Sequence, residues 1–419
     1  MLEEILSREN MTRAYKRVLS NKGSAGVDGV EVKSLKGLMN ESWVFIKAEL
    51  LEGVYKPLPV KRVEIPKASG GTRQLGVPTT TDRLIQQGIA QVLSKHYDLT
   101  FCETSYGFRP GKNAHQAIKR AQSYLSEGYT SIVDLDLEKF FDKVNHDYLM
   151  YLLSRKIGDK RVLKLIRKYL ESGVMHGGVF TPSNAGTPQG GPLSPLLSNI
   201  LLDELDKELE RRGHRYVRYA DDCSIYVRSP RAAARVLQSI TLFIEQELKL
   251  KVNKAKSGIR RPTEMTLLGY SFYAVKGGYG LRIAPGSYDR FKRKVKILTR
   301  KTWSLSTEER LVRLNAFCRG WFNYFKLADA KKSFRQLDEW IRSRLRYCIW
   351  HQWKHIRTKL NALVSMGIPK AKAYQWANTR KGGWRVCHSF ILTRAITIDR
   401  LHNFGYISLS QLYSLRLST

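Results

Sequence analysis

The sequence predicts an α+β fold whose last third is helical and strongly basic. In the first 284 residues, strand-like apolar runs are interspersed with segments of helical periodicity, which is typical of α+β proteins. From Pro285 to the end only helical periodicity is found, and 28 Lys and Arg residues stand against 7 Asp and Glu residues. Acidic pairs also lie within the strand-like runs of the first part, and they indicate a functional site there.

Apolar periodicity and turn residues locate the elements of the first part. An opening helical segment ends at the turn-rich Asn21–Gly29, and the strand-like run Val60–Pro66 leads into the loop Ala68–Thr72. Further elements are expected at these positions: a helix at about Asp82–Leu93, a strand at Ser131–Leu137, an amphipathic helix at Lys160–Glu171 and a strand pair at Tyr216–Val227.

Three basic amphipathic helices are expected in the last third. The first carries Phe291, Val295 and Leu298 on one face, and the other two cover about Glu308–Phe325 and Ser333–Lys354. Their aromatic residues could stack on bases, but core packing is the preferred interpretation for most of them.

The composition excludes several classes of protein. The 72 Lys and Arg residues exceed the 37 Asp and Glu residues to give a net charge of +35, which indicates a polyanionic partner such as nucleic acid. Five cysteines lie far apart without a C-x-x-C pair, which argues against a disulfide framework or a zinc ribbon and fits a reducing cytosol. No stretch approaches the roughly 18 apolar residues that span a bilayer, and the N-terminus is unlike a secretory signal. We expect no membrane association.

Two groups of carboxylates are the strongest chemical signal. Asp134 and Asp136 alternate within an apolar run, so we expect both on one face of a strand. Asp221 and Asp222 are flanked by apolar residues on both sides, which predicts a hairpin with the acidic pair at its tip. Clustered carboxylates repel one another unless cations neutralise them, and hard oxygen ligands select Mg²⁺. Two such ions about 3.5–4 Å apart can activate a primer 3′-hydroxyl and stabilise a pyrophosphate leaving group.

These residues resemble the palm motifs of reverse transcriptases. Tyr219–Asp222 (Tyr-Ala-Asp-Asp) is similar to the Y-x-D-D box, and Ile132–Asp142 is similar to the first palm motif. The resemblance implies a right-hand polymerase fold, with fingers and a palm built from antiparallel sheet and helices, followed by an α-helical thumb. It assigns metal binding to Asp136, Asp221, Asp222 and the backbone carbonyl of Leu137, and it leaves Asp134 as a structural residue. Two Mg²⁺ ions are implied as cofactors, with Mn²⁺ as a substitute.

Further motifs carry the same resemblance into nucleotide and template binding. Gly186–Pro195 resembles the loop that contacts template and nucleotide before a palm helix, and its glycines permit close backbone approach. Ile65–Lys67 and Thr72–Gly76 resemble the finger segment that holds the triphosphate, and Arg83 is a weaker candidate there. Ser105–Gly111 matches a structural or template-facing block, and His146 is interpreted as a packed or capping residue. The resemblance implies nucleotide contacts for Lys67, Arg73, Phe141 (which would exclude a ribose 2′-hydroxyl), Gln189, Gly190 and Lys256, and nucleic-acid contacts for Tyr219, Pro188, Gly191 and the primer-grip residue Gly269.

The basic tail resembles the thumb and maturase region of proteins encoded by group II introns. Arg319–Phe325 and Arg344–Lys354 carry this similarity, and Arg293, Lys294 and Arg344 are expected to contact RNA. After about Ser389 we expect too little chain for an endonuclease, which resembles the compact group IIC-like class. The implied domains are an N-terminal extension with fingers at 1–120, also receiving part of 150–185; a palm at 121–284, closed by a linker at Ala284–Gly286; a thumb and maturase (X) domain at 285–389; and a short basic tail at 390–419.

The resemblance implies an RNA-directed DNA polymerase that copies intron RNA during retrohoming and assists splicing as a maturase. Its partners would be intron RNA, an RNA template, a DNA primer or target DNA, and dNTPs, in a bacterial cytoplasm associated with the nucleoid. The sequence leaves open whether the protein is a monomer or a homodimer. Three alternatives compete with this interpretation: a domesticated reverse transcriptase in phage defence or DNA repair, a splicing factor with an inactive polymerase site, and a viral RNA-dependent RNA polymerase. The first cannot be separated by sequence, whereas the intact motifs and Phe141 count against the other two.

Overall fold

A computed structural model describes residues 1–66, 71–182, 185–187 and 190–418. The chain divides into two compact units, Met1–Pro262 (unit 1) and Thr263–Thr419 (unit 2). Lys67, Pro188 and Gln189, all predicted site residues, lie outside the described residues.

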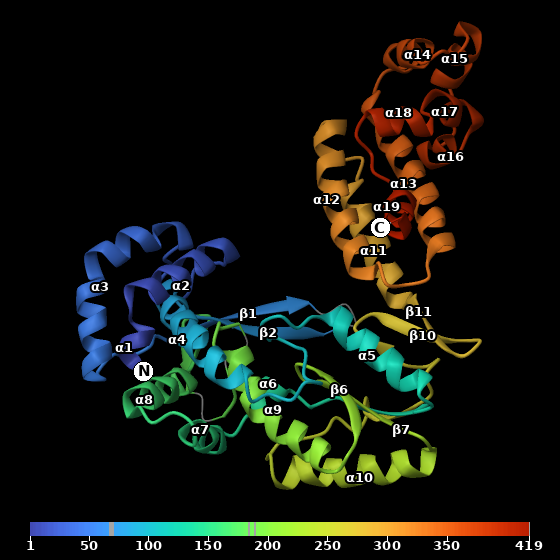
Figure 1. The fold of residues 1–419 in the computed structure, drawn as a ribbon. Coiled ribbons are helices and arrows are strands. Elements are labelled where there is room, and N and C mark those ends of the chain that lie inside the picture. The colour runs from blue at the N-terminus through green and yellow to red at the C-terminus, as the bar shows by residue number, and fades with distance from the viewer. Residues whose placement is uncertain (67–70, 183–184, 188–189, 419) are drawn as a thin grey trace. The chain divides into compact units, whose positions relative to one another are not determined.

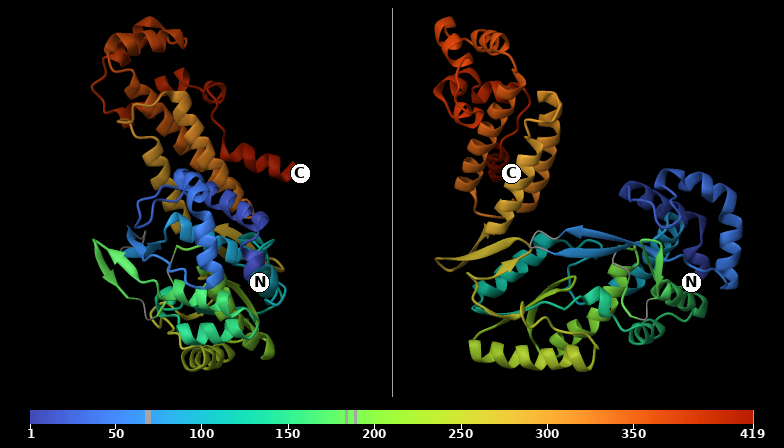
Figure 2. Two further views of the ribbon diagram at one scale, coloured as in Figure 1. Left: turned by 90° about the vertical axis from the view of Figure 1, so that its left-hand side faces the viewer. Right: turned by 180° about the vertical axis from the view of Figure 1, so that it is seen from behind.

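Unit 1 combines helices with two four-stranded sheets (Figure 1). The first sheet has the order β2-β1-β4-β5, in which β1 and β4 are parallel, and the second has the order β6-β7-β3-β8 and is antiparallel. The strands are β1 (Val60–Pro66), β2 (Thr72–Val77), β3 (Ser131–Leu135), β4 (Val174–His176), β5 (Val179–Thr181), β6 (Arg215–Tyr219), β7 (Asp222–Val227) and β8 (Gly258–Arg260). In the left view of Figure 2 the green β4–β5 hairpin projects from the rest of the unit.

The helices of unit 1 form where apolar residues recur at helical spacing. In α8, for example, Val162, Leu165, Ile166 and Tyr169 are buried on one face, and Asp159 caps the first turn by accepting the N–H of Arg161 (3.1 Å). The helical elements are α1 (Leu2–Ile5), α2 (Arg8–Asn21), the 3₁₀ turn η1 (Val32–Ser34), α3 (Leu35–Glu52), α4 (Thr80–Asp98), α5 (Ala114–Ser126), α6 (Phe140–Lys143), α7 (His146–Ser154), α8 (Lys160–Glu171), α9 (Ser194–Arg211) and α10 (Pro230–Gln246).

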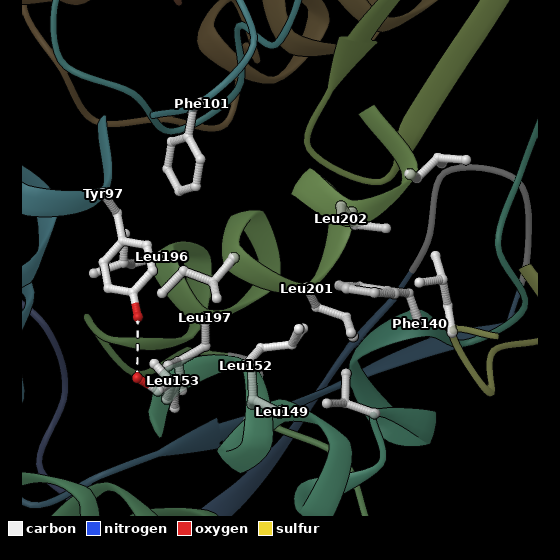
Figure 3. Close-up of a cluster of buried hydrophobic side chains, with 14 of the residues drawn as sticks. Tyr97, Phe101, Phe140, Leu149, Leu152, Leu153, Leu196, Leu197, Leu201 and Leu202 are labelled. Atoms are coloured by element: carbon white, nitrogen blue, oxygen red, sulfur yellow. Dashed lines mark hydrogen bonds between the residues drawn. The ribbon is translucent and has the colours of Figure 1, made fainter. Parts of the chain in front are cut away.

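One hydrophobic core joins the β6-β7-β3-β8 sheet to the helices that pack against it. Side chains from β3, β6 and β7 pack with those of α4, α7, α8, α9 and α10. Figure 3 shows part of this core, in which leucines of α7 and α9 pack together with Phe140 at one side. The Tyr97 hydroxyl donates to the Leu153 carbonyl (3.5 Å). This close packing of the β6-β7-β3-β8 sheet against helices holds the ends of its strands rigidly.

Unit 2 is a three-stranded antiparallel sheet followed by helices. The sheet has the order β11-β10-β9, and Trp321 lies in an aromatic cluster with Phe291 (ring centroids 4.3 Å apart) and Phe325 (4.9 Å). Phe322, Phe325 and Trp350 are buried, as expected for core aromatics. The elements are β9 (Thr266–Leu267), β10 (Tyr270–Val275), β11 (Gly278–Ile283), α11 (Pro285–Leu298), α12 (Thr307–Phe325), α13 (Lys331–Gln352), α14 (Ile356–Ser365), α15 (Lys370–Ala377), α16 (Gly383–Cys387), α17 (Phe390–Ala395), α18 (Ile398–Asn403) and α19 (Leu409–Ser418).

Two local expectations were wrong. Ala284–Gly286 is no linker: Ala284 is the N-cap of α11 and Pro285 its first residue, because proline is well accommodated at the first helical position. The strand expected at Ser131–Leu137 ends at Leu135, because the backbone of Asp136 leaves the ladder to bond with Asn253 and Ser257.

The five cysteines are buried free thiols. Across the part of the chain that the structure describes, no helix combines the length and hydropathy needed to cross a bilayer.

Candidate active site

The β6–β7 hairpin carries an acidic pair at its tip. Tyr219 pairs with Asp222 across the strands, and Ala220 takes a left-handed conformation (φ 56°) to close the turn. The Asp222 side chain stays accessible to solvent. Partial desolvation, and then the negative charges of Asp221, Asp136 and Asp134, raise the pKa of Asp222 to about 6. The tip therefore favours binding of a cation.

Asp136 is fixed beside this tip by the segment that follows α10. Its backbone N–H donates to the Ser257 hydroxyl (2.9 Å), and its carbonyl accepts the N–H of Asn253 (2.8 Å). The Lys256 ammonium lies 3.4 Å from the Asp136 carboxylate. Leu137, predicted as a backbone ligand, forms an isolated bridge with Val252. The backbone of Asp136 is thus held by contacts that leave its carboxylate facing the pocket.

Asp134 has a different environment. Its carboxylate accepts a hydrogen bond from the Arg260 guanidinium of β8 at 3.0 Å. Burial raises the pKa of Asp134, and the Arg260 charge opposes that shift. Asp134 already has a cationic partner, which supports the structural role predicted for it.

Asp136, Asp221 and Asp222, but not Asp134, line one pocket of about 640 Å³. Five carboxylates and three cations line it, so the pocket is acidic overall but also offers positive charge for a phosphate. Its charged lining residues are Asp136, Glu138, Asp142, Asp221, Asp222, Arg73, Lys139 and Lys256. We call this the acidic pocket.

The donor set of the acidic pocket fits a hard divalent cation. Among the described residues, no three acidic, His or Cys side chains converge closely enough to coordinate one ion by themselves. Mg²⁺ does not require such a cage, because it retains waters and is held by one or two carboxylates together with substrate phosphates. Asp136, the residue after β3, and Asp221 and Asp222, at the β6–β7 turn, bring three carboxylates of this kind into the pocket.

The finger strand β2 and the short helix α6 complete the acidic pocket. Arg73 lies on β2 and lines it, as does Phe141 at the start of the short helix α6. The Gly186–Thr187 backbone is bonded beside Phe141, since the Thr187 N–H donates to the Phe141 carbonyl (2.6 Å). A Cβ at Gly186 would lie 2.8 Å from the same carbonyl. Close packing thus fixes the position of Phe141 in the wall.

Gly190 and Gly191 lie close to residues of β2 and α4. A Cβ on Gly190, where φ is +136°, would lie 2.7 Å from the Gly76 carbonyl of β2. A Cβ on Gly191 would lie 2.4 Å from the Gln86 side chain of α4. These glycines therefore seat the loop against the fingers, and their predicted contacts with nucleotide and template stay predictions.

A buried cation behind the hairpin, Arg218, is not among the residues that the sequence predicts for the site. Arg218 has no exposed surface and binds the carboxylate of Asp206 (Nε to Oδ1, 2.8 Å), which is equally buried. It also donates to Asn199 Oδ1 (2.9 Å), to Ser105 Oγ (2.7 Å) and to the Ala220 carbonyl (2.9 Å). Arg218 therefore ties the acidic turn to α9. A charged residue between apolar neighbours in a predicted strand was the signal that could have revealed it.

The Ser105–Gly111 block braces the same turn. A Cβ on Gly107 would lie 2.2 Å from the Ala220 nitrogen, so only glycine fits there. The Gly107 carbonyl accepts the Asn199 amide (2.8 Å), and the Arg109 guanidinium binds Asp98 (2.6 Å). Gly107 and Arg109 therefore have structural roles, and a template-facing role for the block stays a prediction.

Two weaker candidates are packed residues. Arg83 donates to the Ser24 carbonyl (2.6 Å) and is buried. His146 is buried at the start of α7, with Nε2 2.6 Å from the Gly186 carbonyl, in agreement with its interpretation as a packed histidine.

The predicted nucleic-acid residues of unit 2 fall into two kinds. Arg293 and Lys294 are exposed on α11. Arg344 of α13 donates to the Thr299 carbonyl (2.8 Å) at the end of α11 and lies over the Trp384 ring (5.5 Å). Gly269 has φ +82° and packs near Ser287 and Phe325. Arg344 thus has a structural role in unit 2. The predicted RNA contacts of Arg293, Lys294 and Arg344 and the predicted primer contact of Gly269 stay predictions.

Comparison with known proteins gives concordant matches. The model of the reverse transcriptase (RNA-dependent DNA polymerase) family matches residues 65–272, and that of the group II intron maturase-specific domain matches residues 288–363. The chain is 32% identical to Protein YkfC of Escherichia coli (strain K12), over 67% of this chain and 84% of that protein. It is 30% identical to the group II intron-encoded protein LtrA of Lactococcus lactis subsp. cremoris, over 63% of this chain and 55% of LtrA.

The chain thus spans most of YkfC but only about half of LtrA. A solved partial Cas6-RT-Cas1--Cas2 complex aligns at 26% identity and a TM-score of 0.38, over 59% of this chain and 42% of that chain, which is too distant to compare the folds in detail.

Proposed function

The chain belongs to the reverse transcriptases of the group II intron-encoded type, and we propose that it synthesises DNA on an RNA template in the acidic pocket of unit 1. Members of this family depend on divalent metal ions and bind nucleic acid. One observation carries the proposal: Asp136, which follows β3, and Asp221 and Asp222, at the turn of the adjacent β6–β7 hairpin, line one pocket together with Arg73 and Phe141.

The proposed chemistry is transfer of a deoxynucleotide to a primer 3′-hydroxyl. Two Mg²⁺ ions, or Mn²⁺ in their place, held by the three carboxylates and the Leu137 carbonyl, would lower the pKa of the 3′-hydroxyl and neutralise the pyrophosphate. Arg73, Lys67 and Lys256 would neutralise the triphosphate of the dNTP. The Lys256 ammonium lies 3.4 Å from the Asp136 carboxylate, which supports a position for it beside the metal ions. Phe141, in the wall of the acidic pocket, would exclude a ribose 2′-hydroxyl. Gln189 and Gly190 position the base.

The RNA partner is proposed to be a group II intron, whose splicing the protein assists and whose cDNA it makes during retrohoming. Exposed Arg293 and Lys294 would bind the phosphate backbone of RNA or of the template–primer duplex, without reading sequence. Residues proposed to contact template or primer are Tyr219, Pro188, Gly191, Gly269 and Arg344. We propose the domains implied by the resemblance: fingers at 1–120, palm at 121–284, thumb and maturase domain at 285–389, and tail at 390–419. The compact units divide at Pro262 instead, so residues 263–284 of the proposed palm belong to unit 2. The protein is proposed to bind RNA in a bacterial cytoplasm as a monomer or a homodimer.

Primer extension on a structured RNA template tests the polymerase. We expect long cDNA from dNTPs in Mg²⁺, little product from ribonucleotides and none with EDTA. Asp221→Asn should abolish synthesis while RNA affinity is retained, and the matched control Glu138→Gln, also in the acidic pocket, should retain synthesis. A wild-type protein that binds RNA and makes no cDNA would exclude the polymerase. Splicing of the flanking intron RNA at limiting Mg²⁺ tests the maturase role, which is contradicted if the protein gives no acceleration.

A further inference from the structure

A second pocket lies at the opposite end of the β6–β7 hairpin from the catalytic tip. It has a volume of about 500 Å³, and we call it the arginine pocket. Its defining residues are Arg212, Arg215, Arg228, Arg235, His214 and Tyr129.

The charged side chains that line the arginine pocket are all arginines. It contains four arginines and no Asp or Glu, whereas five carboxylates line the acidic pocket. Arg212 is held by Glu208 (2.6 Å). The other three, Arg215, Arg228 and Arg235, form no ion pair with any carboxylate that the structure describes. Unneutralised guanidinium groups around a concavity repel one another, and a phosphate that bridges them removes this repulsion.

Separate elements bring these arginines together. Arg212 follows α9, Arg215 begins β6, Arg228 follows β7, and Arg235 lies on α10. The α10 N-terminus, with Ala232 in the pocket lining, adds positive potential. A sheet edge and two helices therefore fix the spacing of the charges, which is unlike a run of lysines on one flexible surface.

Tyr129 adds a flat wall to the arginine pocket. The Arg228 guanidinium lies 4.9 Å from the centroid of its ring, a stacked arrangement that restrains the side chain. Hydrogen bonding and the positive charges of Arg228 and Arg215 lower the pKa of the Tyr129 hydroxyl, as expected in a cationic environment. An aromatic ring beside guanidinium groups is a common arrangement for contacts with nucleotides.

The arginine pocket is distinct from the catalytic site. Arg215 pairs with Tyr226 and Tyr219 pairs with Asp222, so the two pockets occupy opposite ends of the hairpin and share no lining residue. At about 3.3 Å per residue, the four steps from Arg215 to Tyr219 separate them by roughly 13 Å.

We propose that the arginine pocket binds a backbone phosphate of the partner RNA, at a segment outside the template–primer duplex. The inference rests on the proposed function for the existence of that RNA partner, but not for its polymerase chemistry. A phosphodiester is also present in DNA, so the test includes DNA.

The test compares Arg215→Gln/Arg235→Gln with wild type and with a matched control, Lys119→Gln/Arg231→Gln. Both variants remove two exposed cations from unit 1, but the control residues lie outside the pocket lining. Thermal unfolding checks that both variants fold. Affinity is measured against salt for three ligands: a structured RNA of several helices, a short RNA–DNA template–primer, and a DNA duplex of the same length. Primer extension on the short template–primer is measured in parallel.

For the pocket variant we expect a shallower salt dependence for the structured RNA, by roughly 0.9 in log–log slope for each phosphate that the protein no longer neutralises. At about 0.1 M salt this corresponds to roughly eightfold weaker binding for each such phosphate. Affinity for the short template–primer and the extension rate should equal those of wild type. The control variant should lose less affinity for the structured RNA, relative to wild type, than the pocket variant loses.

Three results would overturn the proposal. The pocket variant and the control could bind structured RNA equally, which would leave only non-specific charge. The decrease in affinity could be equal for the short template–primer, which would place the pocket in the duplex path. The decrease could also occur with DNA alone, which would exclude RNA as the ligand. A wild-type protein without polymerase activity would refute the proposed function and leave this comparison of affinities intact.

Discussion

Replacing Arg218 with Met removes a buried cation and leaves its partner, Asp206, charged and without exposure to solvent. Loss of one member of a buried ion pair costs about 3–5 kcal/mol, because the remaining charge is uncompensated. For a unit of this size, 1 kcal/mol corresponds to roughly 2–4 °C in melting temperature. We therefore expect Arg218→Met to lower the melting temperature of unit 1 by roughly 10 °C.

A second substitution separates stability from catalysis. In Arg218→Met/Asp206→Leu the pair is replaced by apolar side chains, so most of the stability should return. The Ala220 carbonyl, which accepts the Arg218 guanidinium at 2.9 Å, still lacks that donor in the double variant. Because Ala220 holds a left-handed backbone between the strands and Asp221, the acidic turn should remain poorly positioned.

Thermal unfolding and primer extension on the same preparations measure the two effects. The expected pattern is a low melting temperature and low activity for the single variant, and a recovered melting temperature with low activity for the double variant. Raising the Mg²⁺ concentration should restore part of the activity of the double variant, since its defect lies in the alignment of ligands. The reasoning is refuted if the single variant unfolds within about 1 kcal/mol of wild type, or if the double variant recovers full activity along with its stability.

Three further predictions follow from individual contacts. Gly107→Ala should sharply reduce primer extension, because its Cβ would lie 2.2 Å from the Ala220 nitrogen; retained activity would show that the turn can shift without harm. Asp134→Asn should change the unfolding free energy by no more than about 1 kcal/mol and leave cDNA synthesis near wild type, since its pair with Arg260 is partly exposed; loss of synthesis in a folded variant would assign Asp134 a catalytic role. Asp338→Ala should expose α19 to hydrogen exchange, because this buried carboxylate accepts N–H groups at the start of that helix (2.8 Å); unchanged protection would contradict the capping role.

Some elements could be predicted because local pattern alone determines them. The strand Val60–Pro66 and the helix Lys160–Glu171 have the same bounds in the structure, since each is encoded by its own apolar spacing and terminating residues. Where a residue's partner is distant in the chain, local pattern was insufficient. The Pro and Gly of Ala284–Gly286 are typical of a loop and predict a linker. Pro285 instead begins helix α11, which packs within unit 2.

The sequence by itself determined the class of chemistry and the carboxylates proposed to perform it, because carboxylate spacing on a strand and at a hairpin tip is a local property. Only the tertiary structure decided what surrounds them. Arg260 binds Asp134 and Lys256 contacts Asp136, and in each pair the two residues are more than one hundred residues apart in the chain. Arg218 and Asp206 find each other inside the core, and the arginine pocket arises where two strands and two helices end together. Such contacts depend on which elements pack side by side, and hydrophobic burial over the whole unit decides that packing.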